Sequence, residues 1–388
     1  MKERKRYINL EGDKTIWGVV FMLMLVSILV VYSATGALAY KKAGGNTWHY
    51  FIKHGIFLVV GFFTMYVVHK IPHRYYSRIG QLAFYLSIGM LIYTLVAGVN
   101  LNNASRWMSI GGQSLQTSDV AKLALMMFLA RQLVKCKEYL HDWKEVAWKL
   151  FAPLTVVCAL IFPANFSTAV LVMVTGLCLL MLGGVYMKHL LVYVGGMAGA
   201  GALAIILAIN VPAVQQAFPR AQTWVNRIDN FSADKSENSD TFYQVTQAKI
   251  AIVNGGIKGR GPGKSIQRNT LPHPYSDYIY AIIVEEYGLI GGTFILILYI
   301  VFFFRGRRIF NLAKDSYGAY LAMGLSLSLV MQALVNMAVA VDLFPVTGQT
   351  LPLVSMGGSS IFFTCIGIGI ILSVSRDLNT SKVKYAAV

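Results

Sequence analysis

Long apolar stretches recur along this sequence, and most are about as long as a bilayer is thick. A transmembrane helix needs roughly 20 mostly apolar residues. The sequence predicts such helices near residues 15–38, 52–69, 79–98, 118–134, 149–163, 167–186, 189–211, 281–304, 317–340 and 358–375. Only 13% of the residues are charged, too few to cover a soluble surface. We therefore expect an all-α polytopic membrane protein with about ten transmembrane helices, a single domain over residues 1–388.

The number of helices depends on how Pro163 interrupts the apolar stretch 149–186. If Pro163 lies in a hairpin turn, the stretch forms two helices; if it only kinks one helix, every later segment changes sides. With the hairpin, the basic clusters fall on the side of the basic N-terminus, whereas without it the cluster 305–308 would face outward. Basic residues favour the cytoplasmic side. Both termini are therefore expected in the cytoplasm, and the long segment 212–280, between the seventh and eighth helices, is expected outside it.

Composition also narrows the function. The net charge of +17 comes from Lys and Arg residues dispersed at the ends of apolar runs, with no basic helix or aromatic-basic module, so we expect no nucleic-acid partner. The basic start precedes an apolar run too long for a signal peptide, which predicts a retained first helix. The cysteines have no metal-type spacing and are expected to be core residues: Cys136, Cys158, Cys178 and Cys365.

The segment Gly259-Arg-Gly-Pro-Gly-Lys-Ser265 lies in the predicted outer loop. Glycines that let the backbone approach a ligand, interleaved with Arg260 and Lys264, are the ingredients of an anion site. The spacing is not that of a Walker A motif, because the gap from Gly259 to Gly263 is one residue short. A flexible glycine turn with solvated charges is the alternative interpretation.

A second polar stretch lies at the mouth of the predicted helix 118–134. Thr117 or Ser118 could cap this helix, and Asp119 and Lys122 are three residues apart, so they share a face and can pair. Ionisable groups at such a helix end are either interface anchors or site residues.

A third stretch, 344–360, combines prolines, glycines and hydroxyl residues just before the last helix. Irregular backbone at membrane depth is tolerated only where it is buried in protein or lines a wet cavity. All three stretches are predicted on the outer side, which favours one shared site.

The polar motifs occur in this order: Asn103-x-x-Arg106-Trp107; Gln116-x-Ser118-Asp119-x-x-Lys122; Tyr243-Gln244; Gly255-Gly256-x-x-Gly259-x-Gly261; Leu271-Pro272 with Ser276-Asp277-Tyr278-Ile279; Glu285-Glu286-x-Gly288; and Pro345-x-Thr347-Gly348 with Leu351-Pro352 and Ser355-x-Gly357-Gly358-Ser359-Ser360. In this order they resemble the SEDS family. Its members FtsW, RodA and SpoVE are ten-helix peptidoglycan glycosyltransferases. The resemblance extends from the first helix to about residue 376.

The resemblance implies an enzyme that polymerises lipid II on the outer face of the bacterial cytoplasmic membrane. The GlcNAc 4-hydroxyl of one lipid II joins the MurNAc C1 of another, and undecaprenyl pyrophosphate leaves. Such a site needs a base, positive charge for the pyrophosphate and an apolar groove for the lipid tails. Asp277 corresponds to the essential aspartate of the family, and Pro272 and Pro274 would keep its segment out of a helix. By spacing alone, Asp277 could instead be the N-cap of the next helix.

The resemblance also indicates substrate-binding residues. The candidates for the pyrophosphate are Arg106, Lys122, Arg260 and Lys264; Asp119 would orient Lys122, and Ser359 and Ser360 could donate hydrogen bonds at the helix start. Glu285 and Glu286 could equally have a structural role at a helix contact. A divalent cation could bridge Asp277 and the pyrophosphate, but the sequence contains no ligand set for one beyond scattered carboxylates.

Some positions depart from the family pattern. Asn165 replaces a carboxylate, which puts any role of that charge in doubt; His273 replaces a Glu, Tyr275-Ser276 replaces His-Thr, and Met356 replaces a Tyr.

Three classes of function remain open: a polymerase, a lipid II transporter, and a scaffold for a class B penicillin-binding protein, the transpeptidase partner expected for this family. The motifs favour the division member FtsW, with a septal location and divisome partners, over the elongation member RodA and its elongasome partners.

Overall fold

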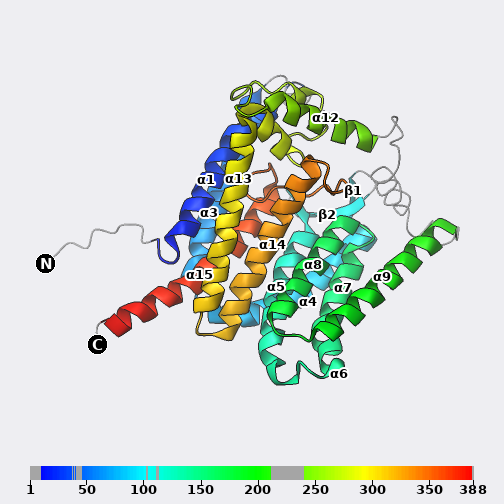
Figure 1. The fold of residues 1–388 in the computed structure, drawn as a ribbon, viewed down its shortest axis with the longest axis vertical. Helices are drawn as coiled ribbons and strands as arrows, with labels where there is room; N and C mark the ends of the chain where they lie inside the picture. Colours follow the sequence, from blue (N-terminus) through cyan, green and yellow to red (C-terminus); the bar gives the residue numbers. More distant parts are fainter. Residues whose placement is uncertain are drawn as a thin grey trace.

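The computed structural model describes residues 10–36, 38, 40, 46–101, 104–110, 113–210 and 240–386. Long helices run side by side through the molecule (Figure 1). They are α1 (Lys14–Ala34), α3 (Thr47–Lys70), α4 (His73–Ala97), α5 (Thr117–Lys135), α7 (Ala152–Ile161), α8 (Phe166–Leu182), α9 (Met187–Asn210), α13 (Ile279–Leu312), α14 (Ser316–Ala340) and α15 (Gly358–Ala386). The short helix α6 (Trp143–Val146) continues through a π-helical turn, Ala147–Phe151, into α7. Each predicted span overlaps one of these helices.

The helices support the expected class of protein. Within the described residues, 6 helices are long and apolar enough to cross a membrane: α1, α3, α4, α13, α14 and the part Gly358–Leu378 of α15. The helix α5 does not meet that criterion; Asp119, Lys122, Arg131 and Lys135 lie on it. The expectation of a polytopic helical membrane protein is confirmed, while the exact number of spans stays a prediction.

Two helices, not one kinked helix, form the apolar stretch around Pro163. The helix α7 ends at Ile161, and α8 begins at Phe166 and packs against α7. Asn165 is the N-cap of α8, and its Oδ1 accepts a hydrogen bond from the Thr168 N–H over 3.3 Å. Because Pro163 lies between the helices, it marks a turn, as the charge distribution predicts.

A small antiparallel sheet connects α4 to α5, which an all-α description leaves out. Its strands are β1 (Val99–Leu101), β2 (Ala104–Ile110) and β3 (Gln113–Gln116), in the order β1-β2-β3. In the register, Trp107 lies opposite Gln116. The strands are short and lie between two apolar stretches that dominate the hydropathy pattern. The last strand, β3, runs directly into α5 and so determines where this helix begins.

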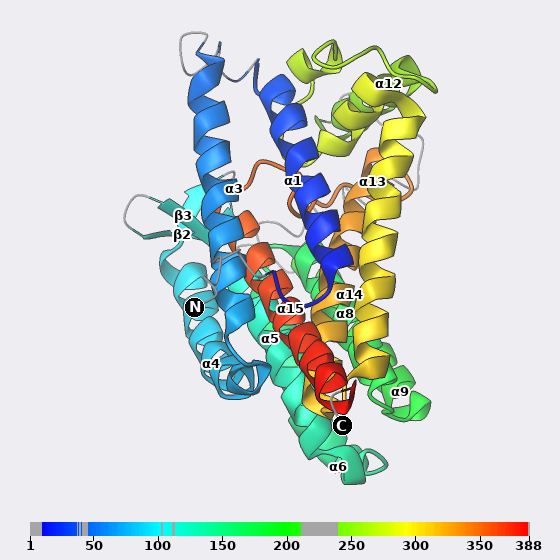
Figure 2. The same ribbon diagram turned by 90° about the vertical axis from the view of Figure 1, so that its left-hand side faces the viewer.

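The described ends of the chain meet at one end of the helix bundle (Figure 2). The Asp13 N–H donates to Ser375 Oγ over 2.7 Å, and Arg376 Nε lies 3.8 Å from Glu11 Oε2. The helix α12 (Asp240–Gly255) lies across the other end, where it packs mainly on α13 (Figure 1). Residues 11–13 and 375–376 therefore lie on the same side of the bundle. The part of the predicted outer loop at 211–239 lies outside the described residues.

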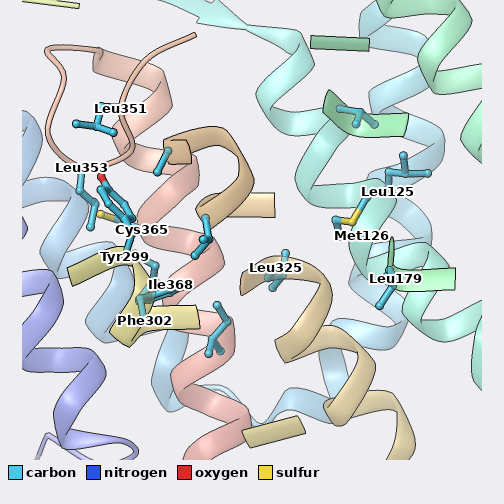
Figure 3. Packing of buried hydrophobic residues seen from close by; sticks show 14 of the residues in the cluster. Leu125, Met126, Leu179, Tyr299, Phe302, Leu325, Leu351, Leu353, Cys365 and Ile368 are labelled. Carbon is cyan, nitrogen blue, oxygen red and sulfur yellow. The ribbon is translucent and has the colours of Figure 1, made fainter. Parts of the chain in front are cut away.

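Apolar side chains from distant segments pack in the middle of the bundle (Figure 3). Leu125 and Met126 of α5 lie near Leu179 of α8 and Leu325 of α14. A second group joins α13, α15 and the loop before α15: Tyr299, Phe302, Leu351, Leu353, Cys365 and Ile368. In a membrane, such contacts stabilise the fold mainly through van der Waals packing, because lipid tails are as apolar as these side chains. The helices α5, α14 and α15 are thus held together, and the polar site is built at their upper ends.

Candidate functional site

Asp277 lies two residues before the first residue of α13 and does not cap the helix. The N-cap residue is Tyr278, and no side chain caps the helix there. The Asp277 side chain is half-buried, and its Oδ1 accepts a hydrogen bond from Ser276 Oγ over 2.8 Å. The capping interpretation is therefore wrong, because the carboxylate is bound by Ser276 and caps no N–H group of α13.

The segment before α15 pairs with the segment that carries Asp277. Ser355 Oγ donates to the Ser276 carbonyl over 2.6 Å and accepts from the Leu351 N–H over 2.8 Å. The Met356 N–H donates to the Tyr275 carbonyl over 2.9 Å. Two motifs about 80 residues apart in sequence thus lie together, as the hypothesis of one shared site requires.

Gly348 leaves space beside the Asp277 carboxylate. Its φ of +65° is in the left-handed region that favours glycine, and a Cβ built on it would lie 3.7 Å from Asp277 Oδ2. The loop can therefore turn close to the carboxylate without covering Oδ2.

Lys122 and Asp119 form the predicted pair on α5. The Lys122 Nζ lies 3.3 Å from Asp119 Oδ1, and the two residues are 8% and 6% exposed. Lys122 Nζ also donates to Oε1 of Gln332, on α14, over 2.5 Å. A buried ammonium is stable only when it is paired and hydrogen-bonded, and both conditions are met here.

The expected cap of α5 is not present. The N-cap residue is Gln116, with no side-chain capping bond. Thr117 Oγ1 lies 3.2 Å from Thr94 Oγ1 of α4, and Ser118 Oγ accepts from Gln116 Nε2 over 3.0 Å. The prediction of a Thr117 or Ser118 cap is wrong because β3 runs directly into the helix, so both hydroxyls lie inside the first turn.

Ser359 and Ser360 open α15 beside α5. Ser359 Oγ accepts from the Gln116 N–H over 3.3 Å, and Ser360 Oγ lies 3.4 Å from Thr350 Oγ1. Together with Asp119 and Lys122, Ser360 lines a narrow cavity of about 20 Å³ between α5, α14 and α15. The structure thus brings four of the predicted site residues into one cluster.

Two amides of α14 that the sequence analysis missed connect this cluster to Asp277. Gln332 Nε2 donates to the Thr350 carbonyl over 2.9 Å, and Asn336 Nδ2 donates to the Asp277 carbonyl over 2.9 Å. The signal that could have identified them is an amide pair at helical spacing in an otherwise apolar span, since polar groups inside membrane helices are costly and usually functional.

The glycine-rich segment packs against the backbone of α13. The N–H groups of Arg260 and Gly261 donate to the carbonyls of Glu285 and Glu286, each over 2.9 Å. Those N–H groups are therefore engaged within the protein, so an anion would meet only the exposed side chains of Arg260 and Lys264. Their role in substrate binding stays a prediction.

Both glutamates of this region are buried and hold the segment in place. Glu285 Oε1 accepts from the Ile266 N–H over 3.0 Å, and Glu286 Oε1 accepts from Ser33 Oγ of α1. Glu285 is eight residues after Asp277, roughly 12 Å along a helix. These contacts favour a structural role for the two glutamates at a helix contact.

Two other predicted positions are only partly visible. Arg106 lies on β2 next to Trp107, and its side chain lies outside the described part of the chain. Asn103 lies outside the described residues altogether.

The departures from the family pattern have local explanations. Asn165 caps α8 through its amide oxygen, so the neutral side chain still fills a structural position there. His273 is exposed with a φ of +55°, and its Nδ1 lies 3.2 Å from the Tyr275 hydroxyl. Burial, with smaller contributions from Tyr50 and Asp277, raises the pKa of the Tyr275 phenol, so it stays a neutral hydrogen-bond donor. Met356 is partly buried against the core.

A divalent cation at this site would need ligands from the substrate. Among the described residues, no group of three or more His, Cys, Asp or Glu side chains could hold a metal ion. Asp277 could supply one oxygen, and Mg²⁺ commonly takes one or two carboxylates together with substrate phosphates.

The family model described as cell cycle protein, FtsW/RodA/SpoVE, matches residues 13–380. The chain belongs to this family. An FtsW of Nitrosococcus halophilus, named a probable peptidoglycan glycosyltransferase, is 31% identical over 97% of this chain and 96% of its own length. A probable peptidoglycan glycosyltransferase FtsW of Marinobacter nauticus is 33% identical over 92% of this chain and 87% of its own length.

Solved structures of the FtsW/RodA/SpoVE family share the fold. A chain of a peptidoglycan synthase complex that coordinates polymerization and crosslinking superimposes with a TM-score of 0.69 at 23% identity, covering 95% of this chain and 98% of that one. The rod shape determining protein RodA of Thermus thermophilus gives a TM-score of 0.64 at 22% identity, covering 94% of this chain and 97% of that one.

Proposed function

We propose that this member of the FtsW/RodA/SpoVE family is a peptidoglycan glycosyltransferase that polymerises lipid II, with Asp277 as the general base. The curated relatives that match nearly the whole chain are named probable peptidoglycan glycosyltransferases. The observation that carries the catalytic assignment is that Asp277 neither caps α13 nor is fully buried, while its Oδ2 adjoins the open side of Gly348. A catalytic base must be able to reach the substrate hydroxyl, and a half-buried carboxylate beside Gly348 supports this proposal.

In the proposed reaction, Asp277 accepts the proton of the GlcNAc 4-hydroxyl of one lipid II. The hydroxyl oxygen then bonds to MurNAc C1 of a second lipid II, and the bond from C1 to the pyrophosphate oxygen breaks. The departing undecaprenyl pyrophosphate carries the negative charge that develops, and Lys122 is a buried cation that lines the same narrow cavity as Ser360. Preorganised positive charge in a low-dielectric site stabilises such a leaving group strongly.

The remaining binding roles are proposals of the same kind. Asp119 orients Lys122 through their ion pair, and Ser359 and Ser360 present hydroxyls at the start of α15. Three further basic residues are proposed to contact the pyrophosphate or the sugar of the bound substrate: Arg106, Arg260 and Lys264. Their contribution is tested separately from that of Asp277 and Lys122.

We further propose that the protein acts in cell division at the septum of the bacterial inner membrane. The support is that the curated relatives quoted are all FtsW proteins. A class B penicillin-binding protein is the proposed partner. The support is that the solved structure with a TM-score of 0.69 belongs to a peptidoglycan synthase complex that coordinates polymerization and crosslinking. Lipid II transport and a purely scaffolding role are the competing functions, and neither requires a reactive carboxylate at position 277.

The decisive experiment is polymerisation of lipid II by the purified protein with its transpeptidase partner, with crosslinking blocked by penicillin. Asp277→Asn keeps the shape of the side chain and removes the base, so we expect glycan polymer to fall by about 100-fold or more. Glycan products are separated on a gel, and elution of the intact complex from a sizing column checks folding. Equal polymer from Asp277→Asn and wild type would reject Asp277 as the base, and no polymer from wild type with a competent partner would favour transport or scaffolding.

A further inference from the structure

Two buried amides lie one turn apart on α14 and face the site together. Gln332 and Asn336 are 3% and 1% exposed. Residues four apart on a helix share a face. Polar side chains within a membrane helix are expensive, so two on the same face need an explanation.

Asn336 fixes the backbone at the proposed base. Its Nδ2 donates to the Asp277 carbonyl over 2.9 Å and to the Gln349 carbonyl over 2.6 Å. With the carbonyl of Asp277 held, the direction in which its side chain leaves the chain is set. The hydrogen bond from Ser276 Oγ to Oδ1 then fixes the rotamer.

Gln332 performs the corresponding task for the proposed cation. Its Oε1 accepts from Lys122 Nζ over 2.5 Å, and its Nε2 donates to the Thr350 carbonyl over 2.9 Å. Gln349 and Thr350 are consecutive, so the two amides of α14 hold neighbouring residues of one loop. Asp277 and Lys122 are thereby tied to the same rigid helix and the same loop.

Asn336 also carries a stability cost that packing alone does not explain. Its Oδ1 is buried and has no hydrogen-bond partner among the described residues. A buried polar atom without a partner destabilises a fold, and an apolar side chain of similar size would avoid that penalty. The two hydrogen bonds that its Nδ2 donates, to the carbonyls of Asp277 and Gln349, offset this cost.

We propose that Gln332 and Asn336 are positioning residues that hold the general base and the pyrophosphate-binding lysine at a fixed separation. The inference rests on the proposed glycosyltransferase function. Asn336 acts through Asp277 and so affects the chemical step, whereas Gln332 acts through Lys122 and so affects binding of the lipid-linked pyrophosphate. A misplacement of about 1 Å at a catalytic group can cost a factor of about 100 in rate.

The first test replaces Asn336 by Asp in the full chain with its transpeptidase partner. Asn336→Asp keeps the shape but removes the N–H donor and places an oxygen against two carbonyls. We expect kcat for lipid II polymerisation to fall at least about tenfold, with KM changed less than about threefold. A loss of active protein would also lower the apparent kcat without changing KM, so kcat is calculated from the folded fraction, measured by elution of the intact complex from a sizing column.

The second test separates the two halves of the Gln332 amide. Gln332→Glu keeps the acceptor for Lys122 but loses the donor to Thr350, whereas Gln332→Met loses both. We expect KM for lipid II to rise about tenfold in Gln332→Met and distinctly less in Gln332→Glu. Equal KM values in the two variants would contradict the assignment of Gln332 to Lys122.

Ser326→Ala is the matched control on the same helix. Ser326 is buried, and its Oγ has no hydrogen-bond partner among the described residues. Its kcat and KM are expected to equal those of the wild type. A kcat loss in Ser326→Ala as large as in Asn336→Asp would reduce the effect to general packing of α14 and overturn the proposal.

Hydrogen–deuterium exchange supplies a measurement that does not depend on activity. In Asn336→Asp and Gln332→Met, the backbone amides of segments 271–278 and 344–357 should exchange faster than in wild type and Ser326→Ala, because the loop loses its anchors. Unchanged exchange in the two variants would overturn the positioning role. A wild type that makes no polymer would reject only the proposed function, and the exchange measurement would still test the positioning role.

Discussion

Single residues of this site are set by what their neighbours leave open. Asp277 lies two residues before the first residue of α13 and has one carboxylate oxygen bound by Ser276, while the other adjoins Gly348. The φ of +65° favours glycine at position 348, and a Cβ there would lie in ordinary contact with Oδ2, at 3.7 Å. Gly348, which has no reactive group, thus lies directly beside the carboxylate that is proposed to act as the base.

Gly348→Ala should reduce polymerisation more than it reduces stability. The left-handed backbone costs an alanine about 1–2 kcal/mol, and the new methyl group would lie 3.7 Å from Asp277 Oδ2, where substrate must approach. Thermal unfolding in detergent and the lipid II assay are measured on the same preparation. Gly89→Ala, at a helical position where a Cβ meets no atom within 4 Å, is the control. Full activity of Gly348→Ala would show that the space beside Oδ2 is not used.

At the scale of elements, the glycine-rich segment packs closely against α13 where that helix is kinked. Gly288 breaks the helix with a φ of +68° and a ψ of −171°. Cβ atoms built on Gly255, Gly259 and Gly288 would lie 2.0, 2.3 and 2.1 Å from backbone oxygens of the facing segment. These contacts bring two backbones together, so packing explains Gly259 of the glycine-rich segment, together with Gly255 and Gly288.

Gly288→Ala should therefore destabilise the protein strongly. A Cβ at this position would overlap the Ile257 carbonyl, and the backbone would also be strained, for a combined cost of about 3 kcal/mol or more. The measurement is the midpoint of thermal unfolding in detergent. Gly195→Ala, in α9 with no atom within 4 Å of its Cβ, should unfold at or slightly above the wild-type temperature. Similar midpoints for the two variants would contradict this close packing.

At the scale of the whole molecule, a polar cluster joins the described ends of the chain at the face opposite α12. Asp13 caps α1 through the Thr15 and Ile16 N–H groups and accepts from Arg305 Nε of α13 over 2.9 Å. Its own N–H donates to Ser375 of α15. Asp13 therefore connects the first helix to α13, which packs beside it, and to α15.

Asp13→Ala and Asp13→Asn separate the two functions of this side chain. Asparagine preserves the cap but not the charge, so we expect Asp13→Ala to lose about 2–3 kcal/mol of stability and Asp13→Asn about 1 kcal/mol less than that. Unfolding temperatures are measured in detergent with and without about 0.5 M salt, which shortens the Debye length to roughly 4 Å. The difference between the two temperatures checks the electrostatic part. Equal losses in both variants would show that capping contributes little.

Much of the fold follows from the sequence because hydropathy is a local property. Each apolar run of about 20 residues predicts a helix whatever it packs against, and the predicted spans overlap the observed helices. The break at Pro163 was decided by the distribution of basic residues along the chain. The strands at 99–116 were missed because they are too short to produce a clear alternating pattern.

The candidate site was predictable only where the residues are ordered in recognisable motifs. Asp277, Lys122 and the last-helix serines were expected, and the structure brings their segments together. Gln332 and Asn336 were not expected, because each reads alone as a single amide in an apolar helix. Their role depends on contacts with residues distant in the chain. Gln332 contacts residues 210 and 18 positions away, and Asn336 contacts a residue 59 positions away.

The sequence by itself determined that this chain is a polytopic membrane protein of the FtsW/RodA/SpoVE family, because span length, charge placement and motif order can all be read along one dimension. Only the tertiary structure decided that Asp277 is not a helix cap, that the glycine-rich segment packs on α13, and that one face of α14 connects the segment of Asp277 to Lys122. Such facts depend on which distant groups satisfy each buried donor and acceptor, and no local pattern encodes that choice.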